Sequence, residues 1–134
     1  MPKVLDNRQI GPLIWKMLIE TPRLVTKAKA GQFVIIRVNE HGERVPMSIA
    51  GLDRQKGILT VIYQVVGKTS ALMTTVPAGG ELADCVGPLG APSHIDNWGT
   101  TRIIGTGPIA IIWPIFRPPS SNFLNTSETN PFWP

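Results

Sequence analysis

Two short stretches of this sequence carry residues that could hold an anion. The first, Gly67-Lys68-Thr69-Ser70, follows the β-branched run 58–66 and opens a predicted short helix over 68–76. A strand, a glycine and a helix start present unpaired N–H groups and a positive dipole end to a phosphate. The same residues also fit a capped surface helix, with Thr69 or Ser70 as N-cap. They do not form a P-loop, because that motif needs a glycine where Ile62 stands.

The second stretch is residues 44–51, with the sequence Arg-Val-Pro-Met-Ser-Ile-Ala-Gly. An apolar strand that begins with a cation and carries Ser48 could lie along a flat, partly anionic ligand. It could equally be an edge strand, since proline within a sheet is mostly confined to edges. Taken alone, the composition favours the edge strand. The presence of residues 67–70 further along the chain reverses that preference.

The elements that would position these stretches are short strands separated by turns. Period-two patterning and β-branched runs predict strands over 3–10, 13–20, 32–38, 44–51, 58–66 and 81–86. Turn signals lie at Gly11-Pro12, at 39–42, where Gly42 should take a positive φ, and at 53–57. We expect the Lys-rich segment 21–31 to be a polar connection. Strands at this spacing are typical of a closed antiparallel barrel or a sandwich.

Composition narrows the classes of function. The 134 residues suffice for one core, and the net charge of +4 is spread over single Lys and Arg residues, which does not favour a nucleic-acid-binding protein. Cys85 is the only cysteine, so no internal disulfide or thiolate cage is expected. The apolar run 109–116 is too short for a membrane span, and the first eight residues are too polar for a signal peptide. We expect a cytoplasmic protein.

Three motifs in order resemble one family. Residues 44–50, residues 63–70 (Tyr-Gln-Val-Val-Gly-Lys-Thr-Ser) and residues 86–90 (Val-Gly-Pro-Leu-Gly) are similar to the FAD-binding barrel of the ferredoxin–NADP reductase superfamily. The most similar branch holds the alpha subunit of NADH-dependent ferredoxin:NADP oxidoreductase and the electron-transfer subunit of dihydroorotate dehydrogenase. The resemblance covers residues 3 to about 107. It implies an all-β fold: a six-stranded antiparallel Greek-key barrel with one short helix.

The resemblance also implies a cofactor, FAD, and a role for each motif. Arg44 would pair with the pyrophosphate, Met47 and Ser48 would lie along the isoalloxazine ring, and residues 67–70 would bind phosphate. Residues 87–90 would close the barrel beside the flavin. The implied cofactor-binding residues are Arg44, Pro46, Met47, Ser48, Ile49, Tyr63, Val65, Gly67, Lys68, Thr69, Ser70, Gly87, Pro88 and Leu89. No catalytic side chain and no metal ligand is expected.

The sequence departs from the superfamily pattern in three places. Arg44 stands four residues before Ser48 instead of three, with Met47 in place of an aromatic residue. The glycine turn Gly105-Thr106-Gly107 continues into Pro108, and relatives are about twice as long. We therefore expect a barrel over 1–100, the aborted start of a Rossmann-like NAD(P)-binding domain over 101–116, and an irregular tail over 117–134. The cysteines that hold an iron–sulfur centre in relatives have no counterpart beside Cys85.

Three functions remain open at this point. The first is the FAD-binding module of a truncated flavin-dependent electron-transfer oxidoreductase, with weak or no NAD(P)H turnover by this chain alone. Its partner would be a subunit that carries iron–sulfur or flavin centres. The second is a non-catalytic barrel that only docks to a partner subunit, and the third, least supported, is a small nucleic-acid-binding barrel. His41 and His94 are expected to be turn and loop residues, and Cys85 a small core side chain.

Overall fold

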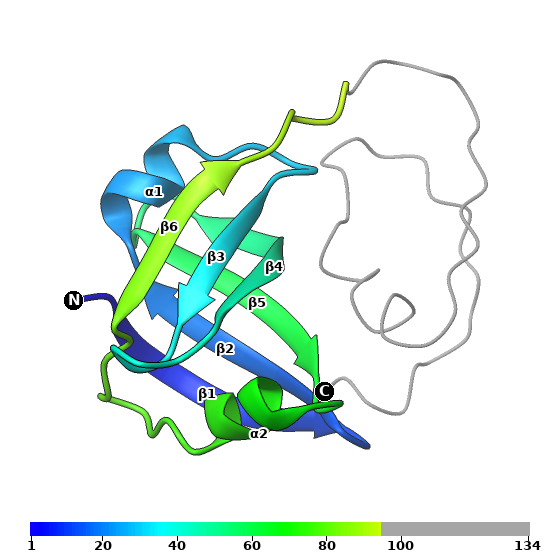
Figure 1. Ribbon diagram of the computed structural model, residues 1–134. Helices are drawn as coiled ribbons and strands as arrows, with labels where there is room; N and C mark the ends of the chain where they lie inside the picture. The colour runs from blue at the N-terminus through cyan, green and yellow to red at the C-terminus, as the bar shows by residue number, and fades with distance from the viewer. Residues whose placement is uncertain (95–134) are drawn as a thin grey trace, which may run out of the picture.

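A computed structural model describes residues 1–94, and the expectations for residues 95–134 lie outside the described residues. The described chain folds into six antiparallel strands with two short helices (Figure 1). The strands are β1 (Lys3–Gly11), β2 (Ile14–Glu20), β3 (Phe33–Arg37), β4 (Arg44–Asp53), β5 (Ile58–Gln64) and β6 (Asp84–Leu89). The helices are α1 (Pro22–Lys27) and α2 (Lys68–Thr74). This confirms the predicted mostly-β barrel.

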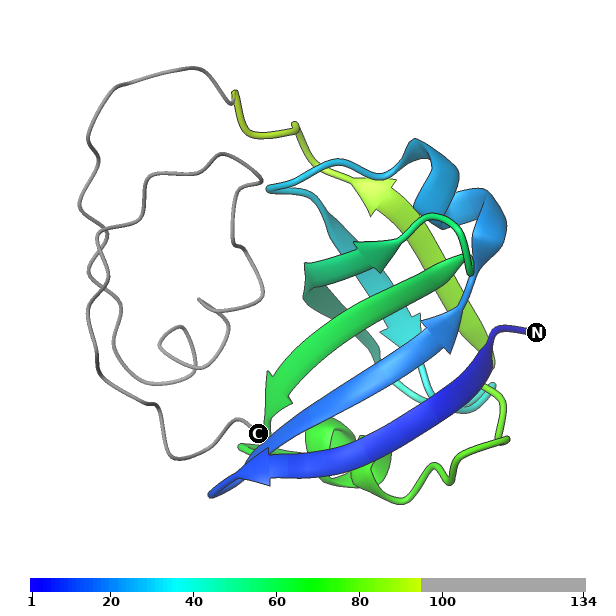
Figure 2. The same ribbon diagram turned by 180° about the vertical axis from the view of Figure 1, so that it is seen from behind.

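The strand order is β1-β2-β5-β4-β3-β6, and each neighbouring pair is antiparallel. An isolated bridge between Lys3 and Glu81 ties the start of β1 to the segment that leads into β6, so the two ends of the sheet approach each other. Figure 2 shows β1, β2 and β5 side by side on one wall, while β6, β3 and β4 form the wall that faces the viewer in Figure 1.

The core lies between these walls, because alternate residues of each strand point inward. In β3, Val34 and Ile36 are fully buried, whereas their neighbours are partly exposed. In β5, Leu59 and Val61 are fully buried as well. The largest completely buried side chains are those of Met17, Ile19, Ile36, Leu59, Met73, Leu82, Val4, Val25, Val34 and Val61.

The helices lie at opposite ends of the barrel (Figure 1). α1 was not expected, because residues 21–31 were read as a polar connection. Pro22 begins the helix. Leu24 and Val25 are buried against the core, so two apolar side chains anchor this six-residue helix. α2 was expected, but its N-cap is Gly67, and Ser70 is its third residue instead of its cap.

Two further details differ from the sequence expectations. Gly42 does not take a positive φ, and the turn is closed by a hydrogen bond of 3.0 Å from its N–H to the carbonyl of Asn39. β6 begins at Asp84, not Glu81, and runs through Gly87 and Pro88. A Cβ at Gly87 would lie 2.9 Å from the Val34 side chain, so this glycine permits close packing of β6 against β3.

Candidate functional site

β4 has a different neighbour along each half of its length. Residues 44–48 pair with β3, from Arg37 opposite Arg44 to Phe33 opposite Ser48. The pairing with β5 begins only at Ile49, opposite Val61, and continues toward Asp53. β4 is therefore an inner strand, and the alternative of an edge strand, which the sequence had left as the less favoured one, does not hold. Its first half nevertheless has one edge that no other strand within residues 1–94 covers.

β5 borders the same opening from the other side. It continues beyond Val61 to Gln64 and pairs there with β2, while its side toward β4 has no partner strand within residues 1–94. The two strands thus separate after the Ile49–Val61 pair. Backbone donors and acceptors along such unpaired edges are available to a ligand, because each non-proline residue carries one of each. The opening leads from Ser48 and Val61 toward Arg44 and the start of α2.

The side chains of residues 44–48 alternate between the two faces of β4. Arg44, Pro46 and Ser48 are exposed, whereas Val45 and Met47 pack partly buried against the core. Ile49 is buried. The side chains of Met47 and Ile49 therefore belong mainly to the core, and the outer face of the strand is formed by a guanidinium, a proline ring and a hydroxyl.

Two residues of β3 extend this outer face. Phe33 on β3 lies between Ser48 on β4 and Leu89 on β6, because it is the register partner of both. Ile35 lies in the same way between Pro46 and Val86. Ser48, Pro88 and Leu89 are among the residues expected at the site from sequence, whereas Phe33 is not. The period-two pattern of the 32–38 strand and a hairpin register would have found it.

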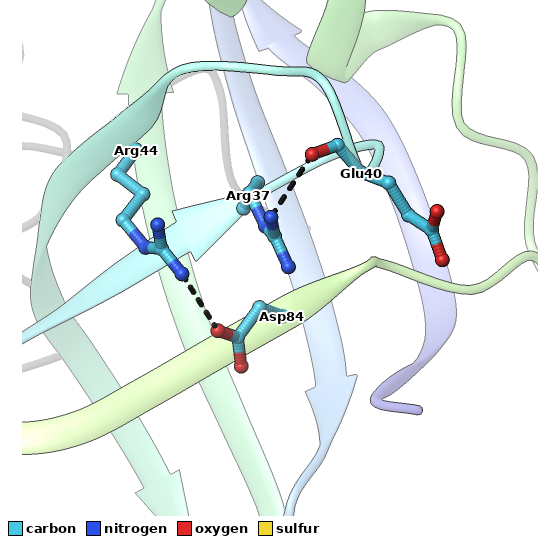
Figure 3. A network of polar contacts seen from close by, with 4 residues as sticks. All are labelled: Arg37, Glu40, Arg44 and Asp84. Carbon is cyan, nitrogen blue, oxygen red and sulfur yellow. Dashed lines mark hydrogen bonds and ion pairs between the residues drawn. The ribbon is translucent and has the colours of Figure 1, made fainter.

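The charged end of this face is formed by three strands (Figure 3). Arg37 is the register partner of both Arg44 and Asp84, so the three side chains stand in one row. Nη2 of Arg44 lies 3.7 Å from a carboxylate oxygen of Asp84, and Nη1 of Arg37 donates to the carbonyl oxygen of Glu40 at 3.0 Å. The Arg44 side chain is 57% exposed. Arg44 is thus a more than half exposed cation with one nitrogen of its fork near Asp84.

The segment before α2 lies close to the start of β4. The hydroxyl of Thr69 donates a hydrogen bond of 2.7 Å to a carboxylate oxygen of Glu43, the residue before Arg44. This contact joins the first turn of α2 to β4 across the opening between β4 and β5. Arg44 and the 67–70 segment, which are distant in the sequence, are thereby brought together. Lys68 is exposed beside them.

The hydroxyl of Ser70 bonds to the backbone at the start of α2 and does not face the opening as a free donor. Its hydroxyl oxygen accepts hydrogen bonds of 3.0 Å from the N–H groups of Val66 and Gly67, and the hydroxyl donates to the Gly67 carbonyl at 3.0 Å. It therefore fixes the backbone where β5 passes into α2. Gly67 has extended backbone with φ −158°, and a Cβ there would meet no atom of residues 1–94 within 4 Å. Within this part of the chain, neither backbone conformation nor packing requires a glycine at position 67.

Tyr63 and Val65 point away from the opening. The Tyr63 ring is buried, and its hydroxyl donates to the side-chain oxygen of Asn7 at 3.0 Å. The amide of Asn7 donates in turn to the carbonyls of Met73 and Val76 at 2.8 and 2.9 Å, at the end of α2. Burial raises the pKa of Tyr63 to about 12 against the effect of this hydrogen bond. Tyr63 thus helps to hold α2 in place.

Cys85 is partly buried against the core, as expected for a small core side chain. Burial, and secondarily the charge of Asp84, raise the pKa of its thiol to about 12, so it is protonated at neutral pH. Within residues 1–94 no three His, Cys, Asp or Glu side chains are grouped as a metal site would need. None of the helices in that range is long and apolar enough to cross a membrane.

Comparison with known proteins gives relatives that match this chain over most of its length. A dihydroorotate dehydrogenase B electron-transfer subunit homolog of Thermotoga maritima is 35% identical over 116 residues, which are 86% of this chain and 41% of the relative. An uncharacterized protein encoded in the adh 3′ region of Clostridium beijerinckii is 43% identical over 94 residues, or 70% of this chain and 32% of the relative. The chain thus spans about two-fifths or less of these curated relatives. No family model matches it.

A solved structure shares the fold. The structure of an NADH-dependent reduced ferredoxin–NADP oxidoreductase, described in a study of flavin-based electron bifurcation, superposes with a TM-score of 0.71 at 34% identity. The match covers 73% of this chain and 36% of that one. Sequence relatives and fold therefore agree with the three motifs, and the barrel of this chain belongs to the ferredoxin–NADP reductase superfamily.

Proposed function

We propose that this chain is the FAD-binding module of a flavin-dependent electron-transfer oxidoreductase of the ferredoxin–NAD(P)H reductase type. One observation carries the proposal: β4 and β5 separate after the Ile49–Val61 pair, so that residues 44–48 border an opening that ends at the start of α2. In a barrel of this superfamily, that opening joins the two stretches whose residue types suit a flavin and its phosphates.

The donor set at the opening fits a dinucleotide with a pyrophosphate. Arg44 is a largely exposed guanidinium, and such forks bind phosphate oxygens in pairs. Lys68 and the hydroxyl of Thr69 lie at the other side, next to an open glycine. We assign pyrophosphate binding to Arg44, Lys68 and Thr69. Because Gly67 is required by neither its φ nor its packing, we assign it the role of letting a phosphate approach the backbone.

The remaining candidate residues take supporting roles in this proposal. Pro46 and Ser48 present their side chains along the isoalloxazine, whereas Met47 and Ile49 contribute backbone edge, since their side chains face the core. Tyr63 and Val65 contribute backbone from β5, and the Ser70 hydroxyl orients the Val66–Gly67 peptide. Gly87, Pro88 and Leu89 flank the ring from β6, beyond Phe33.

When bound, FAD would supply the redox chemistry that links a nicotinamide nucleotide to an electron acceptor. The chain's own residues bind the cofactor, orient it and place one face of it against the barrel. We expect NAD(P)H as the electron source in the complete enzyme, a partner subunit with iron–sulfur or flavin centres, and a cytoplasmic location. The relatives are named as electron-transfer subunits, which supports the proposal of a partner subunit.

The experiment is flavin uptake by the purified chain. We expect yellow protein, or uptake of added FAD with quenching of flavin fluorescence, and FAD as the flavin released by denaturation. The visible absorption band of bound flavin should show resolved vibrational structure, which the band of free flavin in water lacks. Colourless protein that takes up no added FAD would refute the proposal and leave the alternative, a barrel that only docks to a partner subunit.

A further inference from the structure

We propose that two carboxylates of this chain, those of Glu43 and Asp84, occupy the pyrophosphate contacts of Thr69 and Arg44 and thereby weaken FAD binding. The inference rests on the proposed function and adds to it a pair of residues that set the affinity of the same site. It predicts that neutralising either carboxylate tightens the binding of a phosphate-bearing flavin.

The first contact is between Glu43 and Thr69. The Thr69 hydroxyl has one proton to donate, and it donates that proton to the Glu43 carboxylate at 2.7 Å. A phosphate oxygen can accept this proton only after the carboxylate has moved away. Glu43 is exposed, so the carboxylate can turn into solvent, but its negative charge stays near the site.

The second contact is between Asp84 and Arg44. The carboxylate lies 3.7 Å from Nη2 of Arg44, and its side chain is 33% exposed (Figure 3). Arg37 stands in the same row but directs Nη1 to the carbonyl of Glu40. Within residues 1–94, Asp84 is therefore the carboxylate that Arg44 meets. A pyrophosphate would have to share the guanidinium with it or displace it.

Both contacts are weak enough for a ligand to replace. An exposed ion pair such as Arg44–Asp84 contributes little to stability, because the charges are screened and the side chains lose freedom when they pair. The Thr69–Glu43 hydrogen bond is exposed as well, so water can replace either partner. Removing one such competitor should therefore improve the affinity for FAD about threefold. Because both carboxylates would act on the same pyrophosphate, their effects should add only in part, so we expect a gain between about threefold and about tenfold in the double variant. Salt should reduce the gain, since part of it is repulsion between the carboxylates and the phosphates.

Glu40 offers a matched control. It lies in the same turn as Glu43 and carries the same charge, but it meets Arg37 through its backbone carbonyl. Figure 3 shows its carboxylate directed away from Arg44 and Asp84. Glu40→Gln therefore changes the net charge exactly as Glu43→Gln does without freeing either contact.

The experiment compares FAD with riboflavin, which has the same ring and no phosphate. Dissociation constants are measured at low salt for the wild type, Glu43→Gln, Asp84→Asn, the double variant and Glu40→Gln. We expect tighter FAD binding in the first three variants, unchanged riboflavin binding in all, and less than about a 1.5-fold change for Glu40→Gln. The melting temperature of each variant verifies folding.

The outcomes separate the two proposals. If the wild type binds FAD but Glu43→Gln and Asp84→Asn behave like Glu40→Gln, or bind FAD more weakly, the inference about the carboxylates is wrong and the proposed function stands. Equal tightening of riboflavin would also overturn it, because the effect would then not involve phosphate. If neither the wild type nor any variant takes up FAD, the proposed function fails and this inference fails with it.

Discussion

An arginine stands at each end of β4, and the two are used in opposite ways. Arg54, just after the strand, donates to the carbonyls of Val25, Thr26 and Ala28 at 2.9, 3.0 and 2.7 Å. Its guanidinium closes the last turn of α1. Arg44, which begins the strand, is more than half exposed and lies 3.7 Å from the Asp84 carboxylate. One arginine holds the fold together, and the other makes a weak contact that a ligand could displace.

The two helices also differ in whether they leave groups open to a ligand, although their C-terminal ends are alike. Each has its C-terminal carbonyls satisfied by a side chain from elsewhere: Arg54 serves α1 and Asn7 serves α2. The difference lies at the starts. α1 begins with a proline, which needs no hydrogen-bond partner for its nitrogen. α2 begins beside an open glycine and an exposed lysine, next to the unpaired edge of β4.

Replacing Arg54 should give the largest loss of stability. Arg54→Ala removes three charge-assisted hydrogen bonds and leaves the carbonyls at the end of α1 uncapped, so we expect the free energy of unfolding to fall by about 2–3 kcal/mol. Urea denaturation measures this. Arg54→Lys keeps the charge but not the planar fork and should lose an intermediate amount. A fall below about 0.5 kcal/mol would show that this arginine is not a structural cap.

Helix α1 could not be predicted from the sequence, because the contact that completes it is not local. Thr21 and Pro22 are a common helix start, but the following residues offer only Leu24 and Val25 as an apolar face. The group that completes the helix, Arg54, is 26 residues or more away in the sequence. A contact of that range leaves no periodic signal. The strands were predictable because turn residues and alternation are local.

The site divides in the same way. Arg44, Ser48, Gly67 and Thr69 could be proposed as site residues from residue type and motif order. The branching of β4 between β3 and β5 could not, because it depends on three strands at once. The carboxylates that meet Thr69 and Arg44 were also missed, although Glu43 directly precedes Arg44.

Alkaline pH should destabilise the fold through Tyr63 on β5 and Cys85 on β6. The pKa of Tyr63 is raised to about 12 by burial, and that of Cys85 to about 12 by burial and the charge of Asp84. Both groups keep their protons in the folded chain at pH values where the unfolded chain has lost them. Stability is therefore complete below the unfolded pKa values and is lost as pH rises from about 9–10 through 12.

Tyr63→Phe tests this directly. Each titrating group contributes at most about 1.4 kcal/mol per pH unit to the alkaline slope of the unfolding free energy. We expect the slope between pH 10 and 12 to become shallower by up to that amount in Tyr63→Phe, measured by urea denaturation at several pH values. Cys85→Ala should reduce the alkaline slope of the unfolding free energy by a separate amount. An unchanged slope in Tyr63→Phe would mean that its hydroxyl titrates alike in both states.

The most direct measurement of the central claim is the affinity for FAD of Arg44→Ala beside that of Arg8→Ala. The two arginines are matched: Arg8 is 59% exposed and lies 3.3 Å from Asp6, and Arg44 is 57% exposed and pairs with Asp84. Loss of a guanidinium–phosphate contact should weaken FAD binding by about tenfold in Arg44→Ala. Arg8→Ala should bind FAD like the wild type, and both variants should unfold within about 0.5 kcal/mol of it. Equal FAD affinities for the two variants would contradict the account.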